Sequence, residues 1–400
     1  MADVIVGANY STTLGVVRSV GLAGYGVRLL ATNNACGEIA GKSKYVTKMA
    51  TASLDFGEIY CGLEQLCGND ERILVIPTQD RSCVLLDQHF DLLKEHYYTP
   101  NIHQLTGEVT RLMDKLEQKN IAADCGLATA EGNAYVTDRT GIDVALCAAK
   151  YPCIIKPIAS AKCDASKTLI TVCSNRDELE SGMLRAKEQG CERVLLERFL
   201  SGGKDYAAYG VAVDGEVYIP AFIDTWRSGF GGHKGVTAEG AVLDAERFGE
   251  VTERLKNFVA RIGLTGLFCI DLIECDGTMY FVEMNMRYGA SGYAVTAAGT
   301  NLPGLFADAC IRGNKPDAPM LRSEVTFLSE KVELDAYCDG FLSRKDYMSA
   351  KPGERCFFMK NTEDPGPWLA FRRYKRKRLI RTSIKKMLSC LGLLDTVNRM

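Results

Sequence analysis

The chain has 400 residues, of which 46% are hydrophobic and 24% are charged, and its formal net charge is −2. This is the composition of a globular protein, and the near-neutral charge excludes a general binder of polyanions such as nucleic acid. The length predicts about two or three domains, and no apolar run approaches the roughly 18 residues that a membrane span needs.

The sixteen cysteines form no Cys-x-x-Cys pair, and most of them lie in apolar runs. This pattern argues against a zinc ribbon and favours buried, reduced thiols in a cytoplasmic protein. The first residues contain no basic segment followed by an apolar stretch, so we expect no signal peptide.

The first hundred residues predict the opening of a parallel sheet. An apolar strand at 3–8 is followed by a helix to about Leu22, and Val27–Ala31 forms a second strand. A further strand, Ile73–Ile76, precedes another helix. This β-α-β order indicates a Rossmann-like domain. The Gly-x-Gly-x-x-Gly pattern is absent, which favours a structural turn over a nucleotide site after the first strand.

The middle of the chain alternates between helices and strands. We expect helices at 105–125, 176–189 and 244–262, and strands at 151–157, 168–172, 193–197, 205–213 and 216–223. The glycine-rich segment 224–240 is typical of a mobile loop. From about residue 323 the pattern predicts a smaller β-rich segment.

The most informative stretch is a predicted hairpin at 271–287, in which a Cys-Asp-Gly turn joins two apolar strands. Alternation places Glu283, Asn285 and Arg287 on one face of the second strand, and Asp271 on the first strand can lie across from them. Two carboxylates and an amide oxygen suit Mg²⁺, or Mn²⁺, with substrate phosphates completing its coordination. Arg287 beside the metal would neutralise a phosphoryl group. An exposed strand with incidental charges is the weaker interpretation, because the polar residues recur on one face.

The C-terminal end is strongly basic. Residues 371–378 contain six basic side chains, and Arg381 and Lys385-Lys386 follow with apolar residues between them. This pattern fits a basic amphipathic helix that meets an anionic membrane or substrate, and it fits a solvated tail equally well.

Taken together, the motifs resemble those of the ATP-grasp ligases over roughly residues 1–335. Asp114-Lys115, followed by Gly-Leu-Ala-Thr-Ala, resembles the region of the family's first nucleotide lysine. Tyr-Pro-Cys-Ile-Ile-Lys156-Pro resembles the strand that carries the second lysine, and the hairpin resembles the family's "Glu-x-Asn-x-Arg" strand. The resemblance implies an α/β (α+β) ATP-grasp fold with an N-terminal Rossmann-like pre-ATP-grasp domain.

The same resemblance implies a set of contacts to ATP. Lys115 and Lys156 would lie near the phosphates, Glu197 would accept from the adenine amino group, and Asp205 would bind the ribose. The full set of candidate nucleotide-binding residues is Lys115, Lys156, Glu197, Arg198, Phe199, Leu200 and Asp205. Taken singly, Lys115 also fits a solvated helix lysine, and Asp205 fits a turn residue. One departure is the loop 158–167, which has no glycine to approach the triphosphate, so Lys162, Ser166 and Lys167 are candidates to replace it.

The implied reaction is that of a carboxylate–amine, or carboxylate–thiol, ligase acting through an acyl-phosphate. The implied metal ligands are Asp271, Glu283 and Asn285. The implied catalytic residues are Arg287, which would hold the acyl-phosphate, and Arg227 and Lys234, which would pair with substrate carboxylates.

The expected domains are 1–110 (pre-ATP-grasp), 111–200 (central and small ATP-grasp subdomain), 201–322 (catalytic subdomain) and 323–400 (β-rich segment and basic tail). Within the family, the fused N-terminal domain and the Ile-Pro-Thr-x-Asp segment resemble D-aspartate ligases of peptidoglycan cross-bridge synthesis, and equally ligases for other cell-surface polymers. A small-molecule amino-acid or dipeptide ligase and a non-catalytic nucleotide-binding relative stay open. We expect a cytoplasmic protein; peripheral contact with the inner membrane face and dimerisation are left open.

Overall fold

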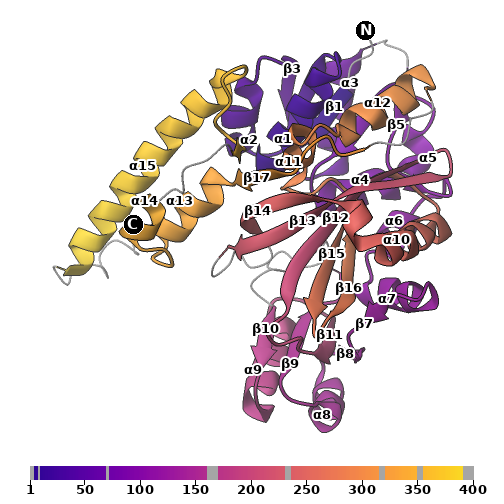
Figure 1. Cartoon of the computed structure of the whole chain (residues 1–400), viewed down its shortest axis with the longest axis vertical. Coiled ribbons are helices and arrows are strands. Elements are labelled where there is room, and N and C mark those ends of the chain that lie inside the picture. The colour runs from indigo at the N-terminus through magenta and orange to yellow at the C-terminus, as the bar shows by residue number, and fades with distance from the viewer. Residues whose placement is uncertain are drawn as a thin grey trace.

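The computed structural model describes residues 4–7, 10–68, 72–159, 170–229, 236–314, 320–348 and 355–390. Three sheets organise the molecule: an N-terminal parallel sheet at the top of Figure 1, a large central sheet, and a small sheet at the bottom. A long C-terminal helix projects to one side (Figure 1). Within the described residues, no helix is both long enough and apolar enough to cross a membrane.

The N-terminal sheet is parallel and has the strand order β3-β2-β1-β4-β5. Its strands are β1 (Val4–Gly7), β2 (Val27–Ala31), β3 (Val46–Thr51), β4 (Ile73–Pro77) and β5 (Tyr97–Tyr98). The connecting segments hold α1 (Tyr10–Leu22), α2 (Asn34–Ile39), η1 (Ala40–Lys42), α3 (Phe56–Cys67), α4 (Asp80–Gln88) and α5 (Phe90–Leu93). All of β4 is buried, as expected for a parallel strand with both faces covered. The predicted β-α-β opening is confirmed.

The small sheet is antiparallel, with the order β10-β9-β11-β8. It consists of β8 (Gly132–Val136), β9 (Cys153–Pro157), β10 (Thr171–Cys173) and β11 (Arg193–Arg198), with helices α8 (Arg139–Ala148) and α9 (Arg176–Glu188). Leu146 and Met183 of the two helices pack with Ile155 and Leu196 of the strands in one apolar cluster.

The large sheet runs β18-β17-β14-β13-β12-β15-β16-β7, with β6 paired to β15. Its strands are β6 (Asn101–Ile102), β7 (Ala128–Thr129), β12 (Lys204–Val213), β13 (Glu216–Ser228), β14 (Thr237–Asp244), β15 (Leu264–Cys275), β16 (Thr278–Asn285), β17 (Val325–Leu328) and β18 (Cys356–Phe357). The adjoining helices are α6 (Glu108–Arg111), α7 (Lys115–Asp124), η4 (Ala245–Phe248), α10 (Gly249–Ile262), α11 (Gly292–Ala297) and α12 (Leu302–Arg312). Leu255 and Phe258 of α10 pack with Phe268 and Phe281 of the sheet.

Three expectations about elements are wrong. The helix expected at 105–125 is divided into α6 and α7, because the Asp114 carboxylate accepts from the amides of Leu116 and Glu117 and starts a new helix. The segment 224–240 is not all loop, since β13 continues to Ser228 and β14 begins at Thr237.

The third correction concerns the C-terminal region. Among the described residues beyond 323, β17 and β18 are the only strands, and most of the rest lies in the helices α13 (Glu330–Cys338), α14 (Arg344–Met348) and α15 (Pro365–Cys390). Two acidic residues in the first turn of α13 favour the helix through its dipole.

The cysteines largely follow the expectation of free thiols. Within the described part of the chain thirteen are free, and six of these are buried. Cys191 is disulfide-bonded, which contradicts the expectation at that position.

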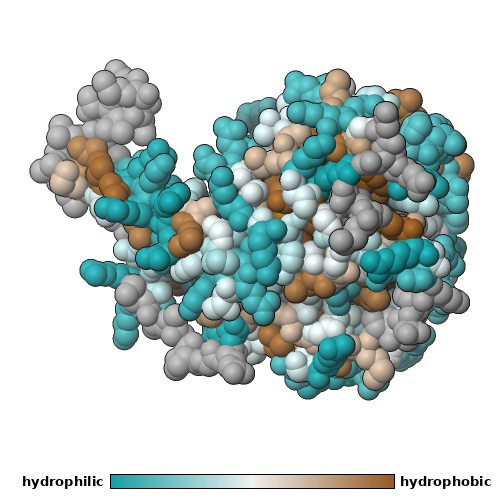
Figure 2. Space-filling model, turned by 90° about the horizontal axis from the view of Figure 1, so that it is seen from above, coloured by the Kyte–Doolittle hydropathy of each residue, from teal (hydrophilic) through white to brown (hydrophobic). Residues whose placement is uncertain are grey.

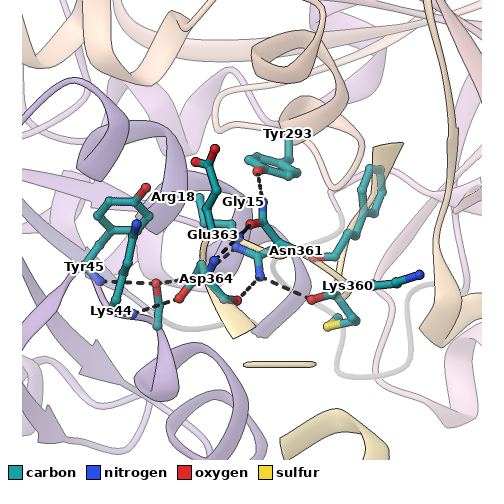
Figure 3. Close-up of polar contacts among 12 residues, drawn as sticks. Gly15, Arg18, Lys44, Tyr45, Tyr293, Lys360, Asn361, Glu363 and Asp364 are labelled. Atoms are coloured by element: carbon teal, nitrogen blue, oxygen red, sulfur yellow. Dashed lines mark hydrogen bonds and ion pairs between the residues drawn. The ribbon is translucent and has the colours of Figure 1, made fainter. Parts of the chain in front are cut away.

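A buried ion pair joins the N-terminal domain to the C-terminal segment (Figure 3). Arg18 of α1 donates Nε to Asp364 Oδ2 at 2.8 Å, and its side chain is 1% exposed. Asp364 also accepts from Ser43 Oγ at 2.9 Å and from the Lys44 amide at 2.8 Å. Arg18 further donates to the Phe358 carbonyl at 2.7 Å. These contacts fix the chain directly before α15 begins.

Candidate functional site

The hairpin predicted from the sequence is formed by β15 and β16. Asp276 and Gly277 have φ values of 50° and 74°, as a two-residue hairpin turn requires. The register pairs Asp271 with Glu283 and Cys269 with Asn285. Cross-strand pairing therefore brings both acidic side chains to neighbouring positions on the sheet.

Asp271, Glu283 and Asn285, called the acidic cluster below, lie in direct contact with two cations. Asn285 Nδ2 donates to Asp271 Oδ2 at 3.2 Å, and Arg287 Nη2 donates to Asn285 Oδ1 at 3.4 Å. Lys115 Nζ lies 2.8 Å from Glu283 Oε2 and is buried. Residues from α7 and from the hairpin, far apart in sequence, are thus joined at one place.

The two carboxylates of the cluster titrate differently. Burial, followed by repulsion from Glu283, raises the pKa of Asp271 to about 7. Burial also acts to raise the pKa of Glu283, but the nearby charges of Lys115 and Lys156 outweigh it and lower that pKa. Below about pH 7 Asp271 therefore retains a proton while Glu283 is ionised, and a cation between the carboxylates would displace that proton.

The donor set fits Mg²⁺ better than a softer metal. Among the residues that the structure describes, no group of three or more His, Cys, Asp and Glu side chains could hold a metal ion. The cluster instead offers two carboxylates and an amide oxygen, which is a typical protein contribution to a Mg²⁺ site that also uses phosphates and water.

Arg287 links the cluster to the N-terminal domain. Its Nε donates to Asp80 Oδ1 at 2.6 Å, from the first turn of α4. Burial alone would lower the pKa of the guanidinium, but the charge of Asp80 raises it, so Arg287 stays cationic. Asp80 was not among the candidate site residues; its place directly after the buried strand β4 is the sequence signal that could have identified it.

A second group of charges lies around Glu197 at the end of β11. Lys156 Nζ lies 2.5 Å from Glu197 Oε2, and Lys119 Nζ pairs with the other oxygen, Oε1. All three side chains are buried. Burial lowers the pKa of Lys119, although Glu197 opposes this effect. Lys119 was missed by the sequence reasoning, yet it follows Lys115 by four residues and so shares its helix face.

The segment after Glu197 is only partly available for a ligand. The Phe199 amide donates to the Pro152 carbonyl at 3.2 Å, and the Phe199 carbonyl accepts from Ser201 at 3.1 Å. Arg198 is exposed and donates to Tyr280 Oη at 3.1 Å, while Leu200 is buried. The backbone of Phe199 is therefore engaged within the protein.

Asp205 and Arg227 lie on neighbouring strands with different partners. Asp205 is two residues from Ala207, which pairs with Asp271, so the two carboxylates share a sheet face. Burial raises the pKa of Asp205, and its Oδ2 accepts from Ser228 at 3.3 Å.

Arg227 contacts carboxylates outside the acidic cluster. Its Nη2 lies 3.1 Å from Glu239 Oε2, and its Nη1 pairs with Glu333 of α13. Lys234 and the segment 160–169, which includes Lys162, Ser166 and Lys167, lie outside the described residues. The structure therefore assembles the acidic cluster with Arg287, Lys115 and Lys156, whereas Arg227 belongs to a separate ion-pair network.

Comparison with known proteins identifies the class. Residues 114–311 match the family "Carbamoyl-phosphate synthase L chain, ATP binding domain". The biotin carboxylase of Campylobacter jejuni superposes with a TM-score of 0.63 at 16% identity, covering 81% of this chain and 74% of that chain. N5-carboxyaminoimidazole synthetase from Staphylococcus aureus, in complex with ADP, superposes with a TM-score of 0.62 at 17% identity, covering 85% of each chain. An L-amino acid ligase from Bacillus licheniformis superposes with a TM-score of 0.58 at 16% identity, covering 80% of this chain and 75% of that chain.

The fold is therefore a mixed α/β ATP-grasp fold with an N-terminal domain, as the sequence predicted. Residues 114–311 therefore match an ATP-binding domain of the ATP-grasp superfamily. One of the superposed structures, a biotin carboxylase domain from Hydrogenobacter thermophilus, was solved in complex with MgADP. No curated protein matches the sequence. At these identities the solved structures establish the fold alone.

Proposed function

We propose that this protein is an ATP- and Mg²⁺-dependent ligase that activates a carboxylate as an acyl-phosphate and joins it to an amine. The observation that supports this most is the acidic cluster, in which the pKa of Asp271 is about 7 and Lys115 and Arg287 lie within hydrogen-bonding reach. A site that only bound nucleotide would need affinity for phosphates but no cationic Arg287 beside the metal ligands.

The site residues divide into three roles. Asp271, Glu283 and Asn285 would hold Mg²⁺, which when bound supplies charge neutralisation for the phosphates. Lys115 and Lys156 would pair with phosphate oxygens in place of their present carboxylate partners. The remaining candidate contacts to ATP are Glu197, Arg198, Phe199 and Leu200 for the base and Asp205 for the ribose.

The reaction has two steps, each of which forms one bond and breaks another. A substrate carboxylate oxygen attacks the γ-phosphorus of ATP, the bond to the bridging oxygen breaks, and ADP leaves. The amine nitrogen then attacks the acyl carbon, phosphate departs, and the nitrogen gives up a proton. Arg287 would stabilise the charge on the acyl-phosphate and the oxyanion. Arg227 and Lys234 are the residues that we propose for the substrate carboxylate, which requires Arg227 to leave Glu239 or Glu333.

We also propose the identity of the two substrates, the carboxylate and the amine. The resemblance noted above favours an amino acid such as D-aspartate as the carboxylate, joined to a peptidoglycan or other cell-surface precursor. A ligase of free amino acids is the second candidate, because the fold also superposes on an L-amino acid ligase. We also propose that segments 1–110, 111–200 and 201–322 act as separate domains that enclose the substrates, with the Asp80–Arg287 contact joining the first to the third.

The test is phosphate release from ATP and Mg²⁺ with D- and L-amino acids, each with and without a UDP-linked muramoyl pentapeptide. Hydroxylamine added without the amine should trap the acyl-phosphate as a hydroxamate. Lys156→Ala and Glu283→Ala should abolish turnover while the fold is retained. Lys187→Ala and Glu188→Ala, at exposed positions at the end of α9, are the matched controls and should keep full activity.

Each outcome separates the candidates. Release that needs D-aspartate and the pentapeptide would select the cross-bridge ligase, and release with two free amino acids would select the small-molecule ligase. Full turnover in folded Lys156→Ala or Glu283→Ala would refute the site assignment. ATP binding without hydroxamate or phosphate release across the panel would contradict the proposed activity on these substrates.

A further inference from the structure

Helix α15 is held to the protein by one of its faces. Phe371 and Thr382 on this inward face are buried. Arg378 Nη2 lies 2.7 Å from Asp339 Oδ1 at the end of α13, and Lys375 lies over the ring of Tyr347 at 5.0 Å. Together with the Arg18–Asp364 contact before its first residue, these interactions give α15 a fixed orientation.

The opposite face of α15 is unusual for a helix surrounded by water. Four large apolar side chains on this face are between 47% and 57% exposed: Leu369, Ile380, Ile384 and Met387. They recur with Arg373 and Arg376 at intervals of three and four residues, which places all six along one side of the helix. The apolar residues on the inward face are covered by the protein, whereas the described residues leave these four in solvent.

The charge of α15 has a single sign. Residues 365–390 contain nine basic and no acidic side chains, in a chain whose net charge is −2. Six of these basic side chains are exposed and have no ion-pair partner in the described part of the chain: Arg372, Arg373, Arg376, Lys377, Arg381 and Lys385. Figure 2 shows hydrophobic side chains beside hydrophilic ones on the arm that projects from the molecule.

We infer that α15 binds parallel to a membrane surface that contains anionic lipids. The exposed apolar side chains would enter the boundary between headgroups and acyl chains, while the basic side chains meet lipid phosphates. The basic residues within the helix keep it from crossing the bilayer, in agreement with the lack of a membrane-spanning helix among the described residues. The inference does not depend on the proposed reaction.

A second copy of the chain is a poorer occupant of this face. In a two-helix seam built on the same side, Arg373 and Arg376 would occupy core positions beside the apolar residues. Since α15 contains no acidic residue, a partner α15 offers these arginines no counter-charge. An anionic lipid surface provides that charge together with an apolar layer.

The test is flotation of the full-length protein with vesicles of phosphatidylcholine alone and of phosphatidylcholine with 30% phosphatidylglycerol. We expect binding to the anionic vesicles only, weakening as salt shortens the electrostatic range. Arg373→Glu with Arg376→Glu should weaken partitioning by about tenfold or more. Arg185→Glu with Lys187→Glu, a matched pair of charge reversals at exposed sites on α9, should leave it unchanged.

A triple variant, Ile380→Ser with Ile384→Ser and Met387→Ser, tests the apolar contribution. It should also weaken binding several-fold, and helical circular dichroism should verify that α15 is retained. Unchanged binding by this variant would overturn the inference, because attraction to polyanions needs no apolar residues. Absence of wild-type binding to anionic vesicles would overturn it too, as would a dimer in solution that the triple substitution dissociates.

Discussion

Two neighbouring carboxylates of the same hairpin behave differently because their surroundings differ. Both are partly buried, but Glu283 has Lys115 at 2.8 Å, whereas Asp271 accepts from the neutral amide of Asn285. Burial therefore dominates at Asp271, and the positive charges dominate at Glu283. The identity of the residue does not decide its charge at neutral pH; its contacts do.

This difference predicts a pH-dependent response to Mg²⁺. The folded pKa of Asp271, about 7, is above its ordinary value of 3.8, so the stability that this group contributes is present below pH 3.8 and is lost as pH rises through 7. Metal binding requires the deprotonated form, so apparent affinity should fall about tenfold per unit below the pKa. The increase in Tm caused by MgCl₂ should therefore be larger at pH 8 than at pH 6.

Asp271→Asn should remove most of this pH dependence, measured by differential scanning fluorimetry. Asp276→Asn, in the turn of the same hairpin, is the matched control and should retain it. An equal Mg²⁺-induced shift at both pH values in the wild type would contradict the assignment of Asp271 as a metal ligand.

At the scale of elements, one glutamine aligns the lysine-bearing helix with the acidic hairpin. Gln118 of α7 accepts from the Met284 amide at 2.7 Å and donates to the Met284 carbonyl at 3.0 Å. It also donates to the Leu112 carbonyl at 2.7 Å, and it is buried. Lys115 and Glu283 flank these contacts on their own elements, so the position of the ion pair depends on Gln118.

Replacing Gln118 by Leu should destabilise the fold and weaken nucleotide binding together. The substitution leaves the Met284 amide without its partner, which should lower the free energy of unfolding by about 1–3 kcal/mol. Urea denaturation measures the first effect, and titration with Mg²⁺-ATP measures the second. Gln65→Leu at an exposed site of α3 is the control. A variant with normal stability and normal ATP affinity would show that Gln118 does not align these elements.

At the scale of the whole molecule, contacts between distant segments complete the structure. Asp80 of the N-terminal domain forms an ion pair with Arg287, which follows the hairpin. Asp364 of the C-terminal segment contacts Arg18 of α1 (Figure 3) and accepts a hydrogen bond from Ser43. Arg18 and Asp364 are 346 residues apart, and both side chains are almost completely buried. Removing one partner of such a buried pair strongly destabilises the fold, because the remaining charge is kept away from water and has no counter-charge.

Asp364→Ala should lower the free energy of unfolding by about 3–5 kcal/mol by leaving Arg18 buried without its carboxylate. It should also make segment 365–390 more sensitive to limited proteolysis. Asp91→Ala, which removes an exposed partner of Lys94, is the control and should change neither property. Wild-type stability in Asp364→Ala would mean that the C-terminal segment is held by its apolar contacts alone.

Local sequence patterns predicted part of the geometry of the candidate site. Alternation along β16 placed Glu283 and Asn285 on one face. The Asp-Gly turn sets the register as far as Leu272 and Phe281, and a β-bulge between Leu272 and Asp271 then shifts it so that Asp271 lies opposite Glu283. Both features depend on residues close together in the chain, where strand geometry fixes side-chain direction. The strands β2 and β9 were predicted for the same reason, because each is an apolar run bounded by turns in the sequence.

Local patterns along the chain were enough to predict most of the elements, the acidic hairpin and the basic character of residues 371–386. The folded structure was needed to show that Asp80 holds Arg287, that Lys119 shares Glu197 with Lys156, and that Arg227 pairs with Glu239 and Glu333. It also decided which face of α15 is covered. The physical reason is that these outcomes arise from burial and from contacts between elements far apart in the chain, which no local pattern encodes.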